Sequence, residues 1–213
     1  MYLAQKHPRH LLRIDLQSKQ RQDLGAIPLS GEILRMAVAE NEKTMACLNL
    51  DHELAIASVD PRNAARWEVV AEPRSSQNQF NRGLCVLQSK EVVTSNGWTA
   101  WSIDAERPDH TPLQLWDGPH YEFTAVLASP DEQMFASSTG AGEIYIRRKS
   151  DGSAVQRLHG HQAEVRAMAF STDGQRLASA GRENMILVWS IETGEILQRL
   201  AGHEETISTL AFS

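Results

Sequence analysis

The sequence predicts an all-β fold made of repeated four-stranded antiparallel blades. Three observations predict it: a 42-residue unit that recurs along the chain, short apolar segments separated by turn residues, and the absence of helical periodicity. The chain has 213 residues, a length that a single all-β domain commonly reaches.

The 42-residue repeat is visible in the glycines. Gly118, Gly160 and Gly202 are each 42 residues apart. When residues 118–159 are placed on 160–201 without a gap, 13 of the 42 positions are identical. Ordinary residue usage gives about two or three identities by chance. The two segments are therefore copies of one structural unit.

The second copy contains four short apolar segments, each long enough for one strand. They are Val165 to Ser171, Arg176 to Gly181, Met185 to Ile191 and Ile196 to Leu200. Asp-Gly and Thr-Gly pairs between them supply the positive φ that tight hairpins need. Several segments are apolar on successive residues, which predicts strands covered on both faces. A blade packed between two neighbouring blades of a β-propeller has this cover.

The same residues resemble the WD-repeat (WD40) family, whose signature is Gly-His before the first strand and Trp-Asp ending the third. Gly160-His161 and Gly202-His203 match the first element. Trp189-Ser190 stands at the second element, with Ser in place of Asp, and Trp101-Ser102 repeats that position. Trp116-Asp117 is a literal Trp-Asp pair, but the 42-residue register places it on a fourth strand.

The resemblance implies a hydrogen-bonded set of four side chains that ties a loop to the strands of its blade. The candidates are His161, Ser179, Glu183 and Trp189. Glu183 stands where the family has Asp, so the sequence leaves open whether the longer side chain closes the network. The preceding unit carries Pro119, Ser137, Ala141 and Arg147 at these positions. That unit is expected to lack the network.

The register predicts a single propeller region of about five blades over residues 1–213. Residues 1–29 form a partial blade of three strands. Full blades are expected at 30–73, 74–117, 118–159 and 160–201, and 202–213 holds the first strand of a further or closing blade.

Two interpretations of the terminal strands follow. The strand at Ile207 to Ser213 pairs with the first three strands and closes a five-bladed ring, or the chain is part of a longer propeller. The second is favoured because the family most often has seven blades. The protein is expected to be a monomer, unless an open fragment associates through its end blades.

Composition and charge exclude several function classes. Lys and Arg total 21 against 27 Asp and Glu, a net charge of −6 with no dense basic cluster, so nucleic-acid binding is not expected. No segment has the length and apolarity of a membrane span or a signal peptide. Cys47 and Cys85 sit in apolar segments and predict buried thiols in a reducing, cytoplasmic environment.

No pattern in the sequence predicts catalysis, a cofactor or a metal. His7 and His10, like His159 and His161, lack a third ligand at zinc spacing. No nucleophile elbow, phosphate loop or dinucleotide fingerprint is present. Ser179, His161 and Glu183 resemble a Ser/His/acid trio, but the repeat register explains them as members of the structural network. The chain is therefore not expected to be an enzyme.

The predicted function is a non-catalytic scaffold for protein–protein interaction. Loops carry binding in such a fold, namely those before each first strand and those between second and third strands. The candidate partner-binding residues are Tyr121, Glu122, Gln162, Glu164, Arg182, Asn184 and Glu204. Expected partners are other proteins or peptides. The repeats resemble bacterial WD-repeat regions, which implies attachment to a kinase or other signalling domain.

Two alternatives stay open. A propeller enzyme or small-molecule binder would use the central channel and would need inward carboxylates or histidines. The aligned first strands at 123–129, 165–171 and 207–213 contain neither, which disfavours it. The other alternative is a structural spacer with no specific partner.

Overall fold

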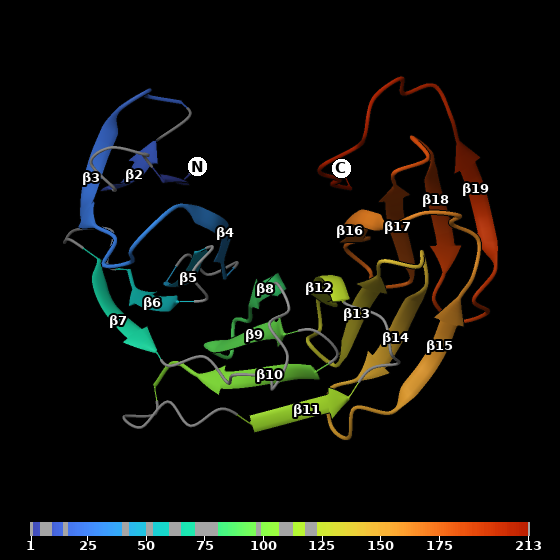
Figure 1. The fold of residues 1–213 in the computed structure, drawn as a ribbon, viewed down its shortest axis with the longest axis horizontal. Coiled ribbons are helices and arrows are strands. Elements are labelled where there is room, and N and C mark those ends of the chain that lie inside the picture. Colours follow the sequence, from blue (N-terminus) through green and yellow to red (C-terminus); the bar gives the residue numbers. More distant parts are fainter. Residues whose placement is uncertain are drawn as a thin grey trace. The chain divides into compact units, whose positions relative to one another are not determined.

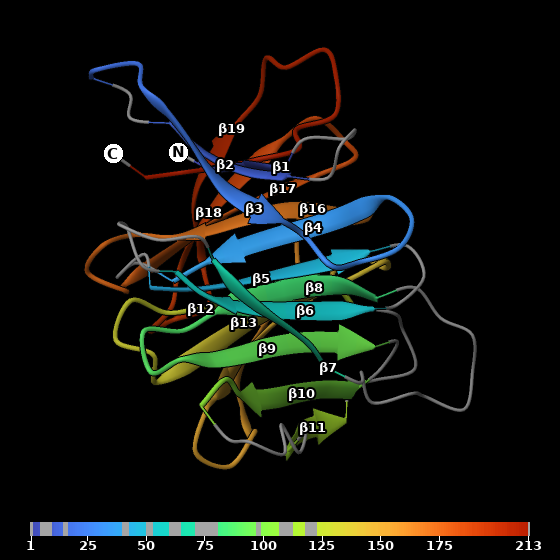
Figure 2. The same cartoon turned by 90° about the vertical axis from the view of Figure 1, so that its left-hand side faces the viewer.

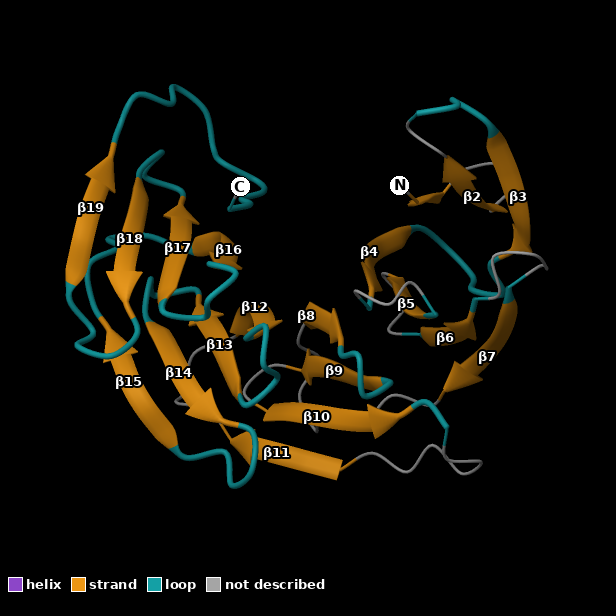
Figure 3. Ribbon diagram, turned by 180° about the vertical axis from the view of Figure 1, so that it is seen from behind, coloured by secondary structure: helices purple, strands orange, loops and turns teal. Residues whose placement is uncertain are grey.

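All regular structure in the described part of the chain is β (Figure 3). The structure is a computed structural model, and it describes residues 2–4, 10–14, 17–39, 43–49, 53–59, 65–70, 81–96, 99–106, 113–117 and 123–212. No helix among these residues is long and apolar enough to span a membrane. The predicted all-β fold class is confirmed.

The described strands form five antiparallel sheets, each built from strands that are consecutive in sequence (Figure 1). The first has three strands, β1 (Tyr2–Ala4), β2 (His10–Ile14) and β3 (Arg21–Ala26). The second is β4 (Ile33–Val38), β5 (Thr44–Asn49), β6 (Leu54–Ser58) and β7 (Arg66–Val70). The third is β8 (Asn81–Val86), β9 (Glu91–Asn96), β10 (Thr99–Asp104) and β11 (Leu113–Asp117).

The last two sheets repeat the same plan. The fourth is β12 (Phe123–Ala128), β13 (Met134–Thr139), β14 (Ile144–Arg148) and β15 (Ala154–Leu158). The fifth is β16 (Val165–Phe170), β17 (Arg176–Gly181), β18 (Ile186–Ser190) and β19 (Ile196–Leu200). Figure 2 shows the order within one sheet clearly, from β8 through β9 and β10 to β11. Such meanders are the blades of a β-propeller.

Backbone irregularities recur at equivalent positions of the sheets. A β-bulge precedes the tryptophan position of the third strand in two sheets, at Ile146/Arg147 and Val188/Trp189, and the third strand of the third sheet has a bulge two positions earlier, at Ala100/Trp101. The turn between first and second strands has a positive φ at Lys90, Glu132 and Gly174. Trp116 lies in β11, the fourth strand of its sheet, as the register requires.

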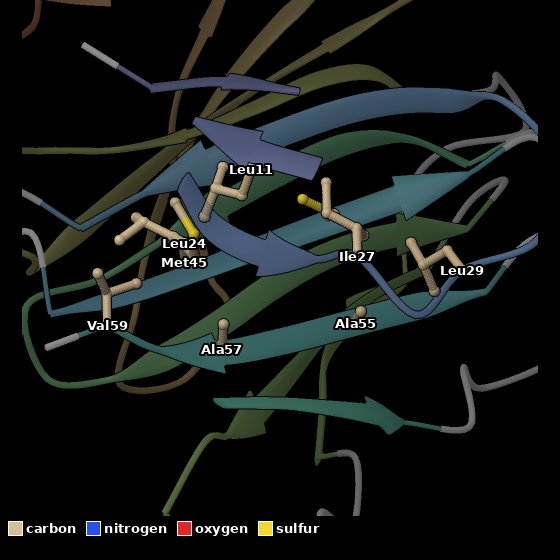
Figure 4. Packing of buried hydrophobic residues seen from close by; sticks show 9 residues of the cluster. Leu11, Leu24, Ile27, Leu29, Met45, Ala55, Ala57 and Val59 are labelled. Carbon is tan, nitrogen blue, oxygen red and sulfur yellow. The ribbon is translucent and has the colours of Figure 1, made fainter. Parts of the chain in front are cut away.

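The residues divide into two compact units, which are described separately. The first comprises 1–73, 86–92 and 103–112, and the second comprises the remaining residues. The first unit has a core between its first two sheets (Figure 4). Its members are Leu11, Leu24, Ile27, Leu29, Met45, Cys47, Ala55, Ala57 and Val59. Burying a large apolar side chain contributes about 1.5–3 kcal/mol.

The second unit packs the fourth sheet against the fifth, with β12 beside β16. Ile144, Ile146 and Leu158 are fully buried against residues of the fifth sheet such as Leu187 and Trp189. Hydrogen bonds add to this packing: Thr124 Oγ1 donates to the carbonyl of Val165 at 2.7 Å. Strands such as β5, in which every residue is buried, are covered on both faces.

The last segment differs from the expectation. Residues 201–212 form no strand, although the sequence predicts one from Ile207. A strand needs a hydrogen-bonded neighbour, and no described strand pairs with this segment. Ile207, 42 residues after Val165, is nevertheless buried against Ala167 and Ala180 of the fifth sheet.

Candidate interaction surface

A buried polar network ties the loop before β16 to the strands of the fifth sheet. His161 Nε2 lies 2.6 Å from Ser179 Oγ on β17, and Trp189 Nε1 on β18 donates to the same oxygen at 2.7 Å. The other ring nitrogen of His161, Nδ1, contacts the Glu183 carboxylate. The His161 side chain is 0% exposed. The structure thus brings the four candidate residues of this network together.

The network fixes the roles of its hydrogen-bonding atoms. A carboxylate only accepts, so the Glu183 contact places the proton on Nδ1 of His161. His161 Nε2 and Ser179 Oγ form the second hydrogen bond of the imidazole, and Ser179 Oγ also lies 3.5 Å from the carbonyl oxygen of Leu187. Ser179 Oγ in turn accepts the indole N–H of Trp189. Glu183 uses one carboxylate oxygen for His161, and its other oxygen, Oε2, is buried with no hydrogen-bond partner among the described residues.

Two glycines make room for the network. A Cβ on Gly181 would lie 2.1 Å from Glu183 Oε2, and a Cβ on Gly160 would lie 2.8 Å from Trp189 Cη2. Both separations are far inside van der Waals contact, so neither position accepts a larger residue without rearrangement. The space over Gly181 is what allows a glutamate, one methylene longer than aspartate, to reach His161.

The fourth sheet has a different arrangement at the same positions. Ser137 Oγ is buried and has no hydrogen-bond partner within the described part of the chain. Arg147 replaces the tryptophan and donates from Nη1 to the carbonyl of Gly152 at 3.0 Å. Its guanidinium lies 5.2 Å from the centre of the Tyr145 ring, and burial lowers the pKa of Arg147. Pro119 lies outside the described residues, and Ala141 offers no acid.

In the third sheet the backbone hydrogen bonds place Thr94 at the serine position and Ile103 at the tryptophan position, so the predicted equivalence of Trp101 with Trp189 is wrong by two residues. Ser95, the residue after Thr94, accepts a hydrogen bond from the Gly83 N–H at 3.1 Å. A Cβ on Gly83 would lie 2.4 Å from Ser95 Oγ, so the glycine is required for this contact. Trp101 Nε1 is buried without a partner among the described residues.

We define the loop surface as residues 140–143, 159–164, 182–184 and 201–206, the loops at one end of the fourth and fifth sheets. Neighbouring loops are packed together there. Gly142 has φ +85°, and a Cβ on it would lie 2.7 Å from the carbonyl oxygen of Ala163. Glycine is therefore the residue that permits this close approach.

Several predicted partner-binding residues are joined on the loop surface. The Arg182 N–H donates to the carbonyl of Glu164 at 3.0 Å, and Arg182 Nε lies 3.4 Å from Glu164 Oε2. Asn184 Nδ2 donates to the carbonyl of Glu204 at 2.8 Å. Gln162 is exposed. Tyr121 and Glu122 lie outside the described residues.

The geometry also describes what the Ser/His/acid trio can do. Ser179 is fully buried, and its oxygen is occupied by both Trp189 and His161. A substrate carbonyl has no access to this oxygen, so the trio is structural. Among the described residues no group of three His, Cys, Asp or Glu side chains is arranged to hold a metal ion.

Residues 126–213 match the family model described as the anaphase-promoting complex subunit 4 WD40 domain. No curated protein matches the chain. The matched residues cover most of the fourth sheet and all of the fifth. Residues 126–213 are therefore similar to a WD40 domain, in agreement with the propeller-like sheets of the chain, and the match suggests a protein-interaction scaffold.

Proposed function

We propose that the chain is a non-catalytic protein-interaction module that presents the loop surface to a protein or peptide. The observation that carries this proposal is the anchoring of the loop at 159–164 through the buried His161 side chain. A loop that is already ordered loses little conformational entropy when a partner binds. The network therefore serves binding by holding the neighbouring exposed residues in place.

The chemistry of the loop surface supports a protein partner. Arg182 is 57% exposed, and it lies beside Glu164, whose side chain is only 14% exposed. Gln162 and Glu204 of the same loop surface are exposed as well. Exposed arginine, amide and carboxylate groups on a rigid support are typical of the polar part of protein interfaces. Arg182 is the residue that we expect to contribute most, because arginine is enriched among energetically dominant contacts.

A pair of matched double variants tests the proposal. The double variant Gln162→Glu with Arg182→Glu replaces one neutral and one positive side chain of the loop surface with two carboxylates. Gln175→Glu with Arg176→Glu makes the same chemical change on exposed residues at the opposite end of the fifth sheet. Partners captured by the wild-type chain from a native lysate are identified by mass spectrometry and compared quantitatively between the variants.

We expect the loop-surface variant to lose a defined set of partners that the opposite-end variant retains. Loss of the same set by both variants, or by neither, would contradict the assignment of binding to the loop surface. Failure of the wild-type chain to retain any partner would favour the structural-spacer alternative.

We also propose an intracellular, reducing location. Cys47 and Cys85 are both free and buried, and burial raises the pKa of each thiol to about 12. Thiols with such a pKa are protonated and inert near neutral pH. Imaging of a tagged chain in its native cells tests the location directly.

A further inference from the structure

A cavity of about 450 Å³ lies inside the first unit, at the ends of β5 and β6 and the start of β7. The turn after β8 and the residues after β10 complete its wall with Lys90, Ala105 and Glu106. Ile56, Ala57 and Val59 give it an apolar floor. Its volume falls in the range of about 300–1,000 Å³ that is usual for ligand pockets.

The sequence explains why this junction between sheets is hollow. In the second unit Gln156, opposite Ile146 on β14, donates from Nε2 to the carbonyl of Glu192 at 2.9 Å. That bond bridges the fourth and fifth sheets. In the second sheet the equivalent residue is Glu68, opposite Ile56 on β6. A carboxylate has no proton to donate to a carbonyl, so Glu68 cannot form the bond that Gln156 forms.

The charged residues that line the cavity determine whether it favours a negatively or a positively charged ligand. Three cationic side chains (Lys43, Arg66 and Lys90) face two carboxylates. Lys90 and Glu106 form an ion pair with each other. The net charge of the other lining residues is positive. Arg66 is exposed at the start of β7, and its planar guanidinium can bind a carboxylate through two parallel hydrogen bonds.

We propose that this cavity binds an acidic peptide segment, with a carboxylate side chain on Arg66 and an adjacent apolar side chain on the floor. A singly charged carboxylate suits the wall better than a phosphate does, because Glu68 and Glu106 repel a doubly charged anion more strongly. The inference rests on the proposed interaction function. It names a second contact site, in the first unit, and the chemistry of the segment that fills it.

Binding is tested by titrating the ¹⁵N-labelled full chain with two matched probes, acetyl-Leu-Glu-Leu-amide and acetyl-Leu-Gln-Leu-amide, and following backbone amide shifts. We expect the Glu probe to move resonances of residues 43–44, 56–59, 66–68, 90 and 105–106. We expect the Gln probe to bind about tenfold or more weakly, because it lacks the charge that Arg66 recognises. Inorganic phosphate at equal ionic strength should compete poorly.

Three variants locate the site. Arg66→Gln should weaken binding of the Glu probe about tenfold, whereas Arg199→Gln, an exposed arginine on β19, should leave it unchanged. Ala105→Trp fills the cavity and should abolish the shifts. Equal binding of both probes, tighter binding of phosphate, or full binding by Ala105→Trp would overturn the proposal.

The outcome separates this proposal from the proposed function. If partners depend on the loop surface while the Glu probe does not bind, only the cavity assignment fails. If the Glu probe binds but no partner is retained from lysate, the cavity stands and the interaction function is wrong.

Discussion

At Gly181 the carboxylate of Glu183 occupies the space that the Cβ of any other residue would need. A Cβ there would lie 2.1 Å from Glu183 Oε2. Because Glu183 holds Nδ1 of His161, we expect Gly181→Ala to detach the loop from the sheet. The free energy of unfolding should fall by about 1–3 kcal/mol. Urea unfolding followed by tryptophan fluorescence would show a lower midpoint with an unchanged slope.

Gly140 provides the matched control, because a Cβ there meets nothing within 4 Å. It lies in the turn between β13 and β14 of the fourth sheet, one residue after Thr139, which is the equivalent of Gly181. Gly140→Ala should change the free energy of unfolding by no more than about 0.5 kcal/mol. Equal losses in the two variants would show that Glu183 is not the cause.

Ser179 and Ser137 occupy the same repeat position with opposite surroundings. Removing the Ser179 hydroxyl leaves Trp189 Nε1 and His161 Nε2 without their partner in a buried site. We expect Ser179→Ala to lower the free energy of unfolding by about 1–3 kcal/mol. Ser137→Ala should be neutral or slightly stabilising, since its buried oxygen has no partner among the described residues. Thermal unfolding of both variants measures the difference, and a larger loss at Ser137 would refute this explanation.

At the level of elements, the turn between first and second strands repeats as a hydrogen-bonded Ser-x-Asp unit. Ser129 Oγ donates to Asp131 Oδ1 at 2.5 Å, and Ser171 Oγ donates to Asp173 Oδ1 at 2.5 Å. Each hydroxyl, helped by a backbone N–H, lowers the pKa of its aspartate. The two turns therefore hold their charge to lower pH than a free aspartate does.

Ser129→Ala should raise the pKa of Asp131 toward its ordinary value and leave that of Asp173 low. The folded pKa lies below the unfolded one, so the stabilisation by Asp131 is complete above the unfolded pKa of about 3.9. It is lost as the pH falls through the folded pKa. Carboxyl ¹³C titration by NMR measures both aspartates in one sample, and an unchanged Asp131 would contradict the assigned cause.

The repeat predicts strands better than it predicts the contacts between them. The 42-residue register places Trp116 on a fourth strand, where the structure has it, because strand order is set by local turns. The closure of Glu183 on His161 could not be predicted, since it depends on the empty space over Gly181. The segment from Ile207 reads as a strand, but pairing requires a neighbour that sequence pattern alone does not reveal.

The cavity of the first unit was equally hidden from sequence analysis. Glu68 is an unremarkable exposed acid until the register aligns it with Gln156 and the structure shows the bridge to Glu192. The Glu68 side chain lacks the N–H donor that Gln156 has. This difference affects the structure only where two sheets pack together. The loop candidates at Tyr121 and Glu122 remain predictions.

At the scale of the whole molecule, the fifth sheet exposes apolar side chains at positions where the fourth sheet buries them. Leu158 of the fourth sheet is fully buried, whereas Leu200, 42 residues later, is 46% exposed. Ile144 is also fully buried, and the equivalent Ile186 is only partly covered. Within the described part of the second unit, the fifth sheet packs on the fourth, and residues of the segment at 201–212 cover part of the equivalent face of the fifth.

We expect this apolar face to cause association at high protein concentration. Leu200→Gln should lower the concentration-dependent mass in sedimentation equilibrium and change the free energy of unfolding by less than about 0.5 kcal/mol. Leu158→Gln, at the buried equivalent position, should instead destabilise by about 3 kcal/mol or more. Association that Leu200→Gln leaves intact would place the contact elsewhere.

The difference between Gln156 and Glu68 also bears on how such a chain acquires new sites. Codons for glutamine and glutamate differ in their first base, so a point mutation converts a bridged junction into an open one. A duplicated array offers this conversion once at every junction, and the neighbouring copies keep the domain folded while one copy changes. The repeat thus contains many equivalent positions at which a single point mutation can open a pocket.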